Sequence, residues 1–266
     1  MGNASHNFVP VLTFHKIDDS FEWGVTRTTP SQFRRILEFL KYEGYESIPL
    51  KMLRHPNFEL PSKPIVLTFD DSYESIYTHA FPLMMEIGFR GTVFIITGYV
   101  GQMNTWDVNL GWKKFKHLSW DQILQMQKKG FELGSHTVHH PDLTWLNPFY
   151  MRSELDRSKK KIEDKTGEEV RFISFPFGRY NRHVIETALD CGYENGCGFW
   201  IRKKDKKRKE TFVFERKAYY LFDGLWNLKA KLNRNAWTSF EDVKLRIVNY
   251  CSHGSSLVKR TKIEFE

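Results

Sequence analysis

Two adjacent carboxylates, Asp70 and Asp71, are the first residues of this chain that could do chemistry. They follow the β-branched and aromatic run I-V-L-T-F, which predicts a buried strand. Adjacent side chains on an extended backbone point to opposite faces, but at a strand end one carboxylate can bind a metal while its neighbour acts as a base in the same cavity. The alternative is that Asp71 or Ser72 caps a helix beginning near Tyr73.

Three histidines lie within five residues at His136–His140, directly after a predicted strand. Neutral imidazole is a preferred ligand of zinc and related metals, and histidines three or four apart on a helical turn present their nitrogens on one side. The spacing leaves open whether His139 or His140 acts with His136. A site of Asp71 and two histidines would keep one coordination position for water, which is typical of catalytic zinc. A His-rich surface loop is the alternative.

Two further segments offer a hydrogen-bond donor and a proton donor. The bend at Pro176–Gly178 follows a predicted strand and can present the Phe177 N–H to a developing oxyanion, although an ordinary turn explains it equally well. His15 ends the first predicted strand. If that strand lies beside the one ending at Phe69, His15 faces the same mouth as the carboxylates and can donate a proton. A structural role is the alternative for His15, and His253 is the rival donor.

Short apolar runs alternate with longer helix-like segments, which predicts an α/β fold that carries these residues. The predicted strands are Val9–Phe14, Ile65–Phe69, Thr92–Thr97, Glu132–Ser135, Arg171–Phe175 and a late strand, Thr211–Tyr220. Capping boxes at Thr29–Gln32 and Ser119–Gln122 predict two helices, which should end near Gly44 and Gly130. Further helices are predicted after Asn147-Pro148, from about Asn181, and at Phe222–Leu232 and Phe240–Tyr250. In such folds the carboxyl ends of the strands meet at one mouth, so the polar clusters are expected to meet there.

The composition is that of an ordinary globular chain, with 266 residues of which 41% are hydrophobic and 27% charged. It excludes disordered, collagen-like and coiled-coil classes. No apolar stretch approaches about 18 residues, and the N-terminus has no visible signal peptide. No linker divides the chain, so we predict one domain over residues 1–266, with a core of about 9–232 and a C-terminal extension at 233–266. Three cysteines without Cys-x-x-Cys spacing indicate neither a disulfide framework nor a thiolate zinc site.

The net charge of +8 comes mainly from one segment. Arg202–Lys209 holds seven basic residues and one acid, so it supplies +6, and the rest of the chain carries only +2. Such a run predicts a solvated loop, with attachment to an anionic surface or to nucleic acid as the alternatives. The run contains no aromatic residue on which a base could stack, which argues against nucleic-acid binding.

Two of these segments together resemble the motifs of the polysaccharide deacetylases, metal-dependent carbohydrate esterases that remove N-acetyl groups from sugar polymers. T-F-D-D at Thr68–Asp71 resembles the first motif of that family, and H-T-V-H-H-P at His136–Pro141 resembles the second, H-[S/T]-x-x-H-P. The resemblance covers roughly Val9–Leu232. It is closest to the bacterial poly-β-1,6-N-acetylglucosamine deacetylases, through the segment that begins V-L-x-F-H-x-I at Val11. It implies a distorted (β/α) barrel and a hydrolase.

The resemblance also implies roles for individual residues. Asp70 is implied as the catalytic base, and Asp71, His136 and His140 as the metal ligands, with the proline after His140 selecting it over His139. His15 is implied as the general acid, because no Leu-x-His segment of the kind that serves most relatives is found near the C-terminus.

One departure from the family pattern concerns the third motif. Many relatives have an Arg-Pro-Pro element whose arginine pairs with the catalytic aspartate, whereas this chain has Ser174–Gly178 at the corresponding place. We therefore predict that Arg216, in the late strand, supports Asp70, with Arg171 as the second choice. The backbone role of Phe177 does not depend on the missing arginine.

The expected cofactor is a divalent metal ion, with zinc as the first expectation and cobalt, nickel and iron compatible with the same ligands. The expected partner is a polysaccharide that contains N-acetylglucosamine. Its linkage stays open between the β-1,6 polymer, peptidoglycan and chitooligosaccharides, and a non-catalytic glycan-binding relative is a further alternative. We predict that the glycan contacts Trp106, Trp112 and Pro176. For each tryptophan, ordinary packing in the core is the alternative. Family habit implies an extracytoplasmic location.

Overall fold

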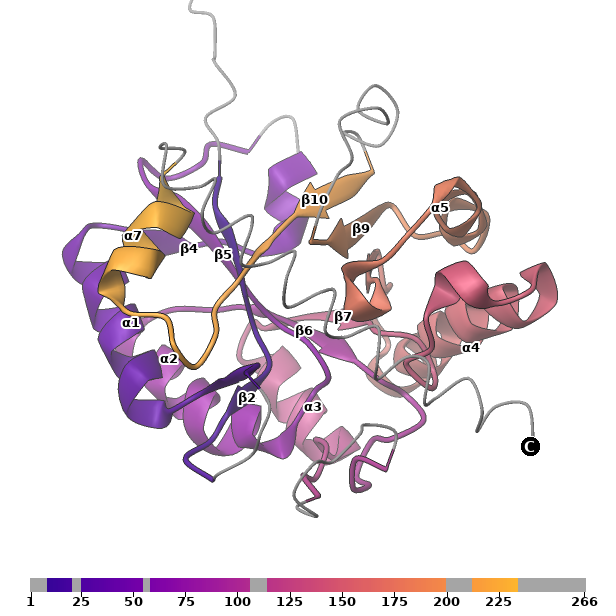
Figure 1. The fold of residues 1–266 in the computed structure, drawn as a ribbon, viewed down its shortest axis with the longest axis horizontal. Coiled ribbons are helices and arrows are strands. Elements are labelled where there is room, and N and C mark those ends of the chain that lie inside the picture. Colours follow the sequence, from indigo (N-terminus) through magenta and orange to yellow (C-terminus); the bar gives the residue numbers. More distant parts are fainter. Residues whose placement is uncertain (1–8, 21–24, 55–57, 106–113, 200–211, 234–266) are drawn as a thin grey trace, which may run out of the picture.

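A nine-stranded parallel sheet, nearly closed into a barrel, forms the centre of the molecule (Figure 1). The computed structural model describes residues 9–20, 25–54, 58–105, 114–199 and 212–233. Along the sheet the strands follow the order β10-β9-β8-β7-β6-β5-β1-β11, and β4 pairs with the start of β5. The strands are β1 (Val11–Phe14), β4 (Glu46–Ser47), β5 (Pro64–Phe69), β6 (Thr92–Ile95), β7 (Glu132–Ser135), β8 (Phe172–Ser174), β9 (Asn195–Gly198), β10 (Val213–Glu215) and β11 (Lys217–Ala218), with a separate pair β2 (Lys16–Ile17) and β3 (Arg27–Thr28).

One extended segment joins the two edges of this sheet. β10 pairs with β9 in the register Glu215 to Gly198, and β11 pairs with β1 in the register Ala218 to Thr13. Only Arg216 separates β10 from β11. The late strand predicted as one element is therefore two short strands, each of which serves a different edge. Figure 1 shows this segment in orange between β10 and α7.

Helices surround the sheet (Figure 1), and the four predicted to begin after Thr29, Ser119, Asn147 and Asn181 are present, whereas the helix Phe81–Ile87 was not predicted. The α-helices are α1 (Pro30–Tyr42), α2 (Phe81–Ile87), α3 (Trp120–Lys128), α4 (Pro148–Thr166), α5 (Arg182–Asp190) and α7 (Leu225–Leu232), and the short turns are η1 (Leu50–Arg54), the π-helical η2 (Ile76–Ala80), η3 (Leu143–Trp145) and η4 (Pro176–Gly178). Both predicted capping boxes, at Thr29 and Ser119, are confirmed. The last described helix begins at Leu225, after Gly224, rather than at Phe222. The predicted helix 240–250 lies outside the described residues.

The side chains of β1 and β5 alternate between the helix layer and the barrel interior. Val11 and Val66 belong with Phe94 to an apolar cluster separate from the core that packs against the helices. Two residues further along, Thr13 Oγ1 lies 2.8 Å from Thr68 Oγ1. Because strand side chains alternate with a period of two, the next inward positions on both strands fall at the mouth of the barrel. The interior therefore changes from apolar to polar toward that mouth.

At the opposite end of the barrel, the half-buried carboxylate of Glu132, at the start of β7, joins three segments. Its oxygens accept hydrogen bonds from Leu50 N (2.8 Å), Thr92 Oγ1 (2.8 Å) and Lys51 N (3.3 Å). Glu132→Ala is expected to lower the free energy of unfolding by about 1–3 kcal/mol, because three donors lose their acceptor. Urea unfolding measures this loss. The control is Glu46→Ala at an exposed strand glutamate, and equal stability of the two variants would contradict the prediction.

Candidate active site

Three of the predicted site residues lie at the mouth of the barrel, each directly after a strand. His15 follows β1, Asp70 follows β5 and His136 follows β7. Phe14 and Phe69 are partners in the β1 and β5 register, so the first two of these residues are neighbours across adjacent strands. The structure thus brings His15 to the same mouth as the carboxylates, as the adjacency of the strands requires.

Arg216 binds both oxygens of Asp70 at the point where the barrel closes. Arg216 Nη1 donates to Asp70 Oδ1 and Nη2 donates to Oδ2, each over 2.8 Å, and both side chains are buried. The guanidinium also lies between two rings, 5.4 Å from the centroid of Phe94 and 5.1 Å from that of Phe199. A planar guanidinium fits a bidentate contact and ring stacking at once. Arg216 therefore gives Asp70 a bidentate, buried partner.

This pairing keeps Asp70 ionised. Burial alone would raise the pKa of Asp70, but the charge of Arg216 and its hydrogen bonds, with the charges of His136 and His15, lower that pKa to about 2. Removal of the arginine would leave burial as the dominant influence on the carboxyl group.

Ser174 completes the contacts of Asp70, and the sequence interpretation did not identify it. Arg216 Nη2 donates to Ser174 Oγ (2.8 Å), and Ser174 Oγ donates to Asp70 Oδ2 (3.2 Å). Ser174 is the last residue of β8, two residues before Pro176, so the period of two in that strand was the signal that could have placed its hydroxyl inside the barrel.

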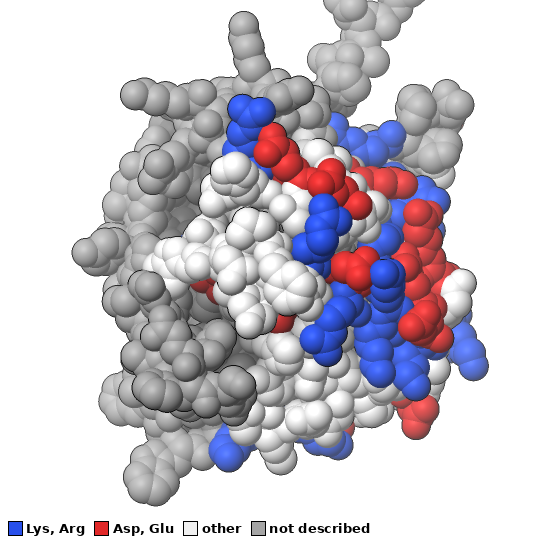
Figure 2. Space-filling view, turned by 90° about the vertical axis from the view of Figure 1, so that its right-hand side faces the viewer, with Lys and Arg blue, Asp and Glu red and all other residues white. Residues whose placement is uncertain are grey.

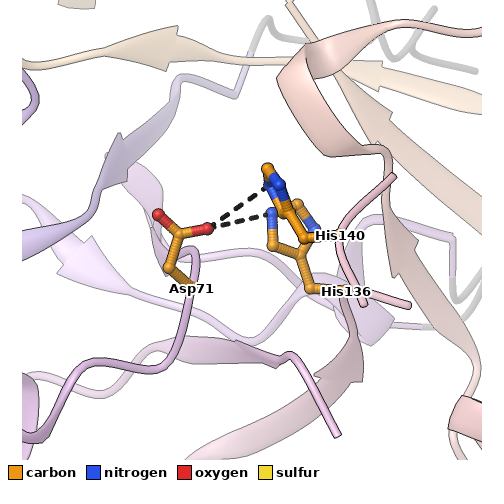
Figure 3. A group of neighbouring side chains, drawn as sticks. All are labelled: Asp71, His136 and His140. Carbon is orange, nitrogen blue, oxygen red and sulfur yellow. Dashed lines mark ion pairs between the residues drawn. The ribbon is translucent and has the colours of Figure 1, made fainter. Parts of the chain in front are cut away.

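Asp71, His136 and His140 form a buried cluster beside Asp70. Their ligand atoms all lie within 4.8 Å of one another. Figure 3 shows one carboxylate oxygen of Asp71 facing both rings, at 3.4 Å from His136 Nε2 and 3.5 Å from His140 Nε2. Metal–ligand bonds of 2.0–2.1 Å in a tetrahedral site separate neighbouring ligand atoms by about 3.3 Å. The spacing of these donors therefore fits a small divalent cation.

Hydrogen bonding within the cluster supports the same conclusion. His136 Nδ1 lies 2.7 Å from the Ser174 carbonyl oxygen, which can only accept, so Nδ1 donates to it and Nε2 is the nitrogen that faces Asp71 and remains for a cation. Asp71 Oδ1 is buried and accepts no hydrogen bond from any described residue. Burial raises the pKa of Asp71, but His136 and His15 outweigh it and leave the pKa below its ordinary value. An ionised oxygen of Asp71 and the rings of His136 and His140 that it faces are a suitable set of ligands for a cation lying between the three side chains.

The ligand loops depend on unusual backbone conformations. Five non-glycine residues in the described chain have left-handed φ angles, and all lie in the three loops at the mouth: Asp71 (64°), Ser72 (51°), Thr137 (68°), His140 (58°) and Phe177 (57°). Each such residue costs about 1–3 kcal/mol, and such strain clusters at functional sites. At Asp71 this conformation breaks the strand alternation after Asp70, so both carboxylates reach one mouth. Residues at an N-cap are extended, so neither Asp71 nor Ser72 is a helix cap.

His139 lies outside the cluster, on the outer side of its loop. His139 Nδ1 pairs with Glu154 Oε1 (2.6 Å), and Glu154 Oε2 accepts from the backbone N–H groups of Val138 and His139, each over 2.9 Å. The helical turn invoked for the histidine spacing is wrong, because this segment is a loop shaped by two left-handed residues. The left-handed turn at His140 returns its ring to the mouth, where it meets His136 at a centroid distance of 4.7 Å.

His15 lies among the charged groups of the site. Its ring is partly exposed, and its Nδ1 is enclosed without a hydrogen-bond partner in the described chain. Burial lowers the pKa of His15 below its ordinary value, although the charges of Asp71 and Asp70 oppose this. A lower pKa makes the protonated ring a stronger acid but leaves a smaller fraction of it protonated at neutral pH.

The turn at Phe177 also adjoins the cluster. The Phe177 ring contacts the His140 ring, with centroids 4.8 Å apart, and Pro176 is buried at the start of the turn. Arg179, just beyond this turn, donates to Asp142 Oδ2 (2.8 Å), so it ties the turn to the loop that carries the histidines. The sequence interpretation identified neither member of this ion pair.

Several predicted residues lie away from the site or outside the described chain. Arg171 is half-exposed and pairs with Glu169 and Glu194, so it does not contact Asp70. Residues outside the described chain include Trp106, Trp112, His253 and the basic run 202–209.

The charged side chains of α4 and α5 cover one face of the molecule with mixed signs. Figure 2 shows lysine and arginine interspersed with aspartate and glutamate there. Ion pairs such as Lys160–Asp156 and Arg182–Glu186 account for part of the mixture.

None of the helices described is both long and apolar enough to cross a membrane.

Comparison with known proteins identifies related sequences. A family model described as polysaccharide deacetylase matches residues 58–196. The chain is 29% identical over 191 residues to YxkH of Bacillus subtilis (strain 168), which covers 71% of this chain and 63% of that protein. It is 25% identical over 177 residues to the poly-β-1,6-N-acetyl-D-glucosamine N-deacetylase of Staphylococcus aureus, which covers 62% of this chain and 59% of that enzyme. The chain thus spans less than two thirds of either relative.

Solved structures share the fold. A deacetylase of Streptococcus pyogenes, in complex with acetate, superposes with a TM-score of 0.71 at 25% identity and covers 85% of this chain and 98% of that one. IcaB from Ammonifex degensii gives 0.67 at 20% identity, covering 84% and 95%, and shows likeness of fold alone. The expected distorted (β/α) barrel is confirmed.

Proposed function

Because the chain belongs to the polysaccharide deacetylase family, we propose that it is a metal-dependent hydrolase that removes N-acetyl groups from a polysaccharide containing N-acetylglucosamine. The observation that carries this proposal is the buried Asp71, His136 and His140 cluster beside an ionised Asp70. A carboxylate, two imidazoles and an adjacent base are the groups that metal-assisted amide hydrolysis needs.

Asp71, His136 and His140 would hold the cation, with zinc as the first candidate. When bound, such a cation supplies Lewis-acid polarisation of the acetyl carbonyl and lowers the pKa of a water molecule from about 15.7 toward about 7. The Ser174 carbonyl keeps Nε2 of His136 available by holding the hydrogen of Nδ1.

Asp70 is the proposed general base. Oδ2 accepts hydrogen bonds from Arg216 and Ser174, whereas Oδ1 accepts one from Arg216 alone among the described residues. We therefore assign to Oδ1 the proton of the attacking water, whose oxygen forms the new bond to the acetyl carbon. With a pKa of about 2, Asp70 is ionised at neutral pH, so Oδ1 is able to accept that proton.

His15 and Phe177 are proposed to handle the charges that develop next. The Phe177 N–H donates to the oxygen that becomes negative as water attacks, a contribution of about 3 kcal/mol where such donors have been removed. His15 donates a proton to the sugar nitrogen as the C–N bond breaks. The products are acetate and a free amino sugar, so oxygen, nitrogen and protons balance.

The substrate class follows from the family and from the relatives. The staphylococcal relative is by name a poly-β-1,6-N-acetyl-D-glucosamine N-deacetylase, so the β-1,6 polymer is our first candidate, ahead of peptidoglycan and chitooligosaccharides. An extracytoplasmic location, glycan contacts of Pro176, Trp106 and Trp112, and attachment of 202–209 to an anionic surface remain predictions.

Acetate release from a panel of these three acetylated glycans tests the proposal. The panel is assayed with the protein as isolated, after chelation, and after the return of zinc or cobalt. We expect acetate from one glycan at least, loss of release with chelator and recovery with metal. Release from none of them would favour a non-catalytic glycan-binding protein, and release unaffected by complete metal removal would overturn the metal dependence.

His140→Ala and His139→Ala form a matched pair that tests the ligand assignment. His140→Ala is expected to lower the affinity for zinc by at least about 100-fold, because one of three ligands is lost. His139→Ala is expected to stay within about threefold of the wild type, since its ring contacts Glu154 on the outer side of the loop. Competition with a chromogenic chelator measures both affinities. Equal losses for the two variants would contradict the assignment of His140.

A further inference from the structure

The segment Phe115–Leu118 lies alongside the loop that carries the metal ligand Asp71. Leu118 N donates to Ser72 O (2.8 Å), and Glu74 N donates to Lys116 O (2.8 Å). On its other side, His117 N donates to Gln102 O (2.8 Å), with further bonds Gly101 N to Leu118 O and Asn104 N to Phe115 O. We call Phe115–Leu118 the anchor segment. Backbone hydrogen bonds hold it between the ligand loop on one side and residues 101–104 on the other.

The ring of His117 contacts the backbone of the ligand loop directly. His117 Nδ1 lies 2.7 Å from the backbone carbonyl oxygen of Asp71. A carbonyl only accepts, so Nδ1 carries the hydrogen and donates it. The ring is fully buried, and it stacks on Tyr73 with centroids 4.9 Å apart and planes 19° apart. Its orientation toward Asp71 is thereby fixed.

The carbonyl that His117 holds belongs to a residue with a left-handed backbone. Asp71 (φ 64°) and Ser72 (φ 51°) are consecutive, and this pair of conformations turns the Asp71 carboxylate toward His136 and His140. Backbone pairing reaches Ser72 through Leu118, whereas the Asp71 carbonyl is reached by the imidazole. The hydrogen bond from His117 therefore acts on the very peptide whose rotation would redirect the ligand.

We propose that His117 is a positioning residue for the metal site, which fixes the Asp71 peptide and so aims its carboxylate at the two histidines. This inference rests on the proposed function, because it takes Asp71, His136 and His140 as metal ligands. It does not depend on which glycan is the substrate.

Three substitutions separate the hydrogen bond from simple packing. In His117→Asn, the side-chain amide can place a donor near the position of Nδ1. In His117→Gln, the amide lies one methylene further out, and in His117→Leu the donor is lost while a side chain of similar size remains. Phe115→Leu is the matched control, since Phe115 is buried in the same anchor segment and also contacts the Tyr73 ring.

Zinc affinity of the full chain, measured by chelator competition, and the absorption spectrum of the cobalt-loaded protein are the readouts. His117→Leu is expected to lose about 10- to 100-fold in zinc affinity, as substitutions behind a metal ligand do. His117→Asn is expected to recover most of that loss and keep the cobalt spectrum, and Phe115→Leu to lower the melting temperature with zinc affinity unchanged.

Wild-type zinc affinity in His117→Leu would overturn the inference, as would an equal loss in Phe115→Leu. If His117→Leu does not fold, the comparison of Asn with Gln decides: tighter zinc binding by His117→Asn supports the hydrogen bond, and equal binding overturns it. These outcomes are separate from the substrate question, since a wild-type chain that binds zinc but deacetylates no glycan would contradict the proposed function alone.

Discussion

Asp70→Asn is expected to abolish deacetylation while the variant still binds divalent metal. The amide cannot accept the proton of the attacking water, and loss of a general base lowers a rate by about 10²- to 10⁴-fold. The metal ligands remain, because Asp71, His136 and His140 are unchanged. Acetate release and the metal content of the purified variant measure the two properties separately.

The neighbouring carboxylate provides the control for this experiment. Asp71→Ala removes a proposed ligand, so it is expected to lose both metal and activity, whereas Asp70→Asn loses activity alone. Deacetylation retained in Asp70→Asn would refute its role as the base. Loss of metal in Asp70→Asn would instead indicate that the two carboxylates do not have distinct functions.

Arg216→Met is expected to have the largest effect on stability and to reduce activity as well. One partner of a buried ion pair is removed, which costs about 3–5 kcal/mol because the other charge is left without compensation. Burial would then raise the pKa of Asp70, so the acid limb of the pH–rate profile should move to higher pH. Urea unfolding and the pH dependence of acetate release measure these changes.

The pH dependence of stability provides a second measure of this ion pair. The pKa of Asp70 falls from an ordinary value of 3.8 to about 2 on folding, so the stabilisation is present above about pH 4 and is lost as pH falls toward 2. Its size is about 2 kcal/mol in the wild type. In Arg216→Met this acid-dependent loss should be absent.

Two controls make the Arg216 prediction specific. Arg171→Met removes an arginine with half-exposed ion pairs and is expected to change stability by less than about 0.5 kcal/mol. The double variant Asp70→Asn/Arg216→Met removes both charges of this pair, so neither is left without its partner and part of the lost stability should return without activity. An acid limb that does not move in Arg216→Met would contradict the proposed control of the Asp70 pKa.

The order of the elements could be predicted from the sequence because capping residues and apolar runs are local signals. Thr29 and Ser119 begin helices through contacts three residues away. The position of His15 beside Asp70 followed once the first strand was assumed to lie next to the strand that ends at Phe69. Arg216 could be selected because a missing arginine in the third motif required a replacement at a strand end.

The remaining features depend on contacts between distant segments. The family resemblance selected His140 over His139, but the spacing of the residues left this choice open. In the structure, the choice is made by left-handed backbone at Thr137 and His140 and by Glu154, 15 residues beyond His139. No periodicity in the sequence indicates such a conformation for a threonine. Ser174 and His117 likewise gain their roles only from the partners that the fold brings to them, at separations of 104 and 46 residues.

The joint between β10 and β11 has a consequence for how the enzyme matures during synthesis. Ribosomes make the chain from its N-terminus, so the cation ligands between residues 71 and 140 emerge well before Arg216. Until that arginine joins the two edges of the sheet, Asp70 lacks the guanidinium that keeps it ionised. A nascent chain therefore contains all three cation ligands before it contains the arginine that keeps Asp70 ionised.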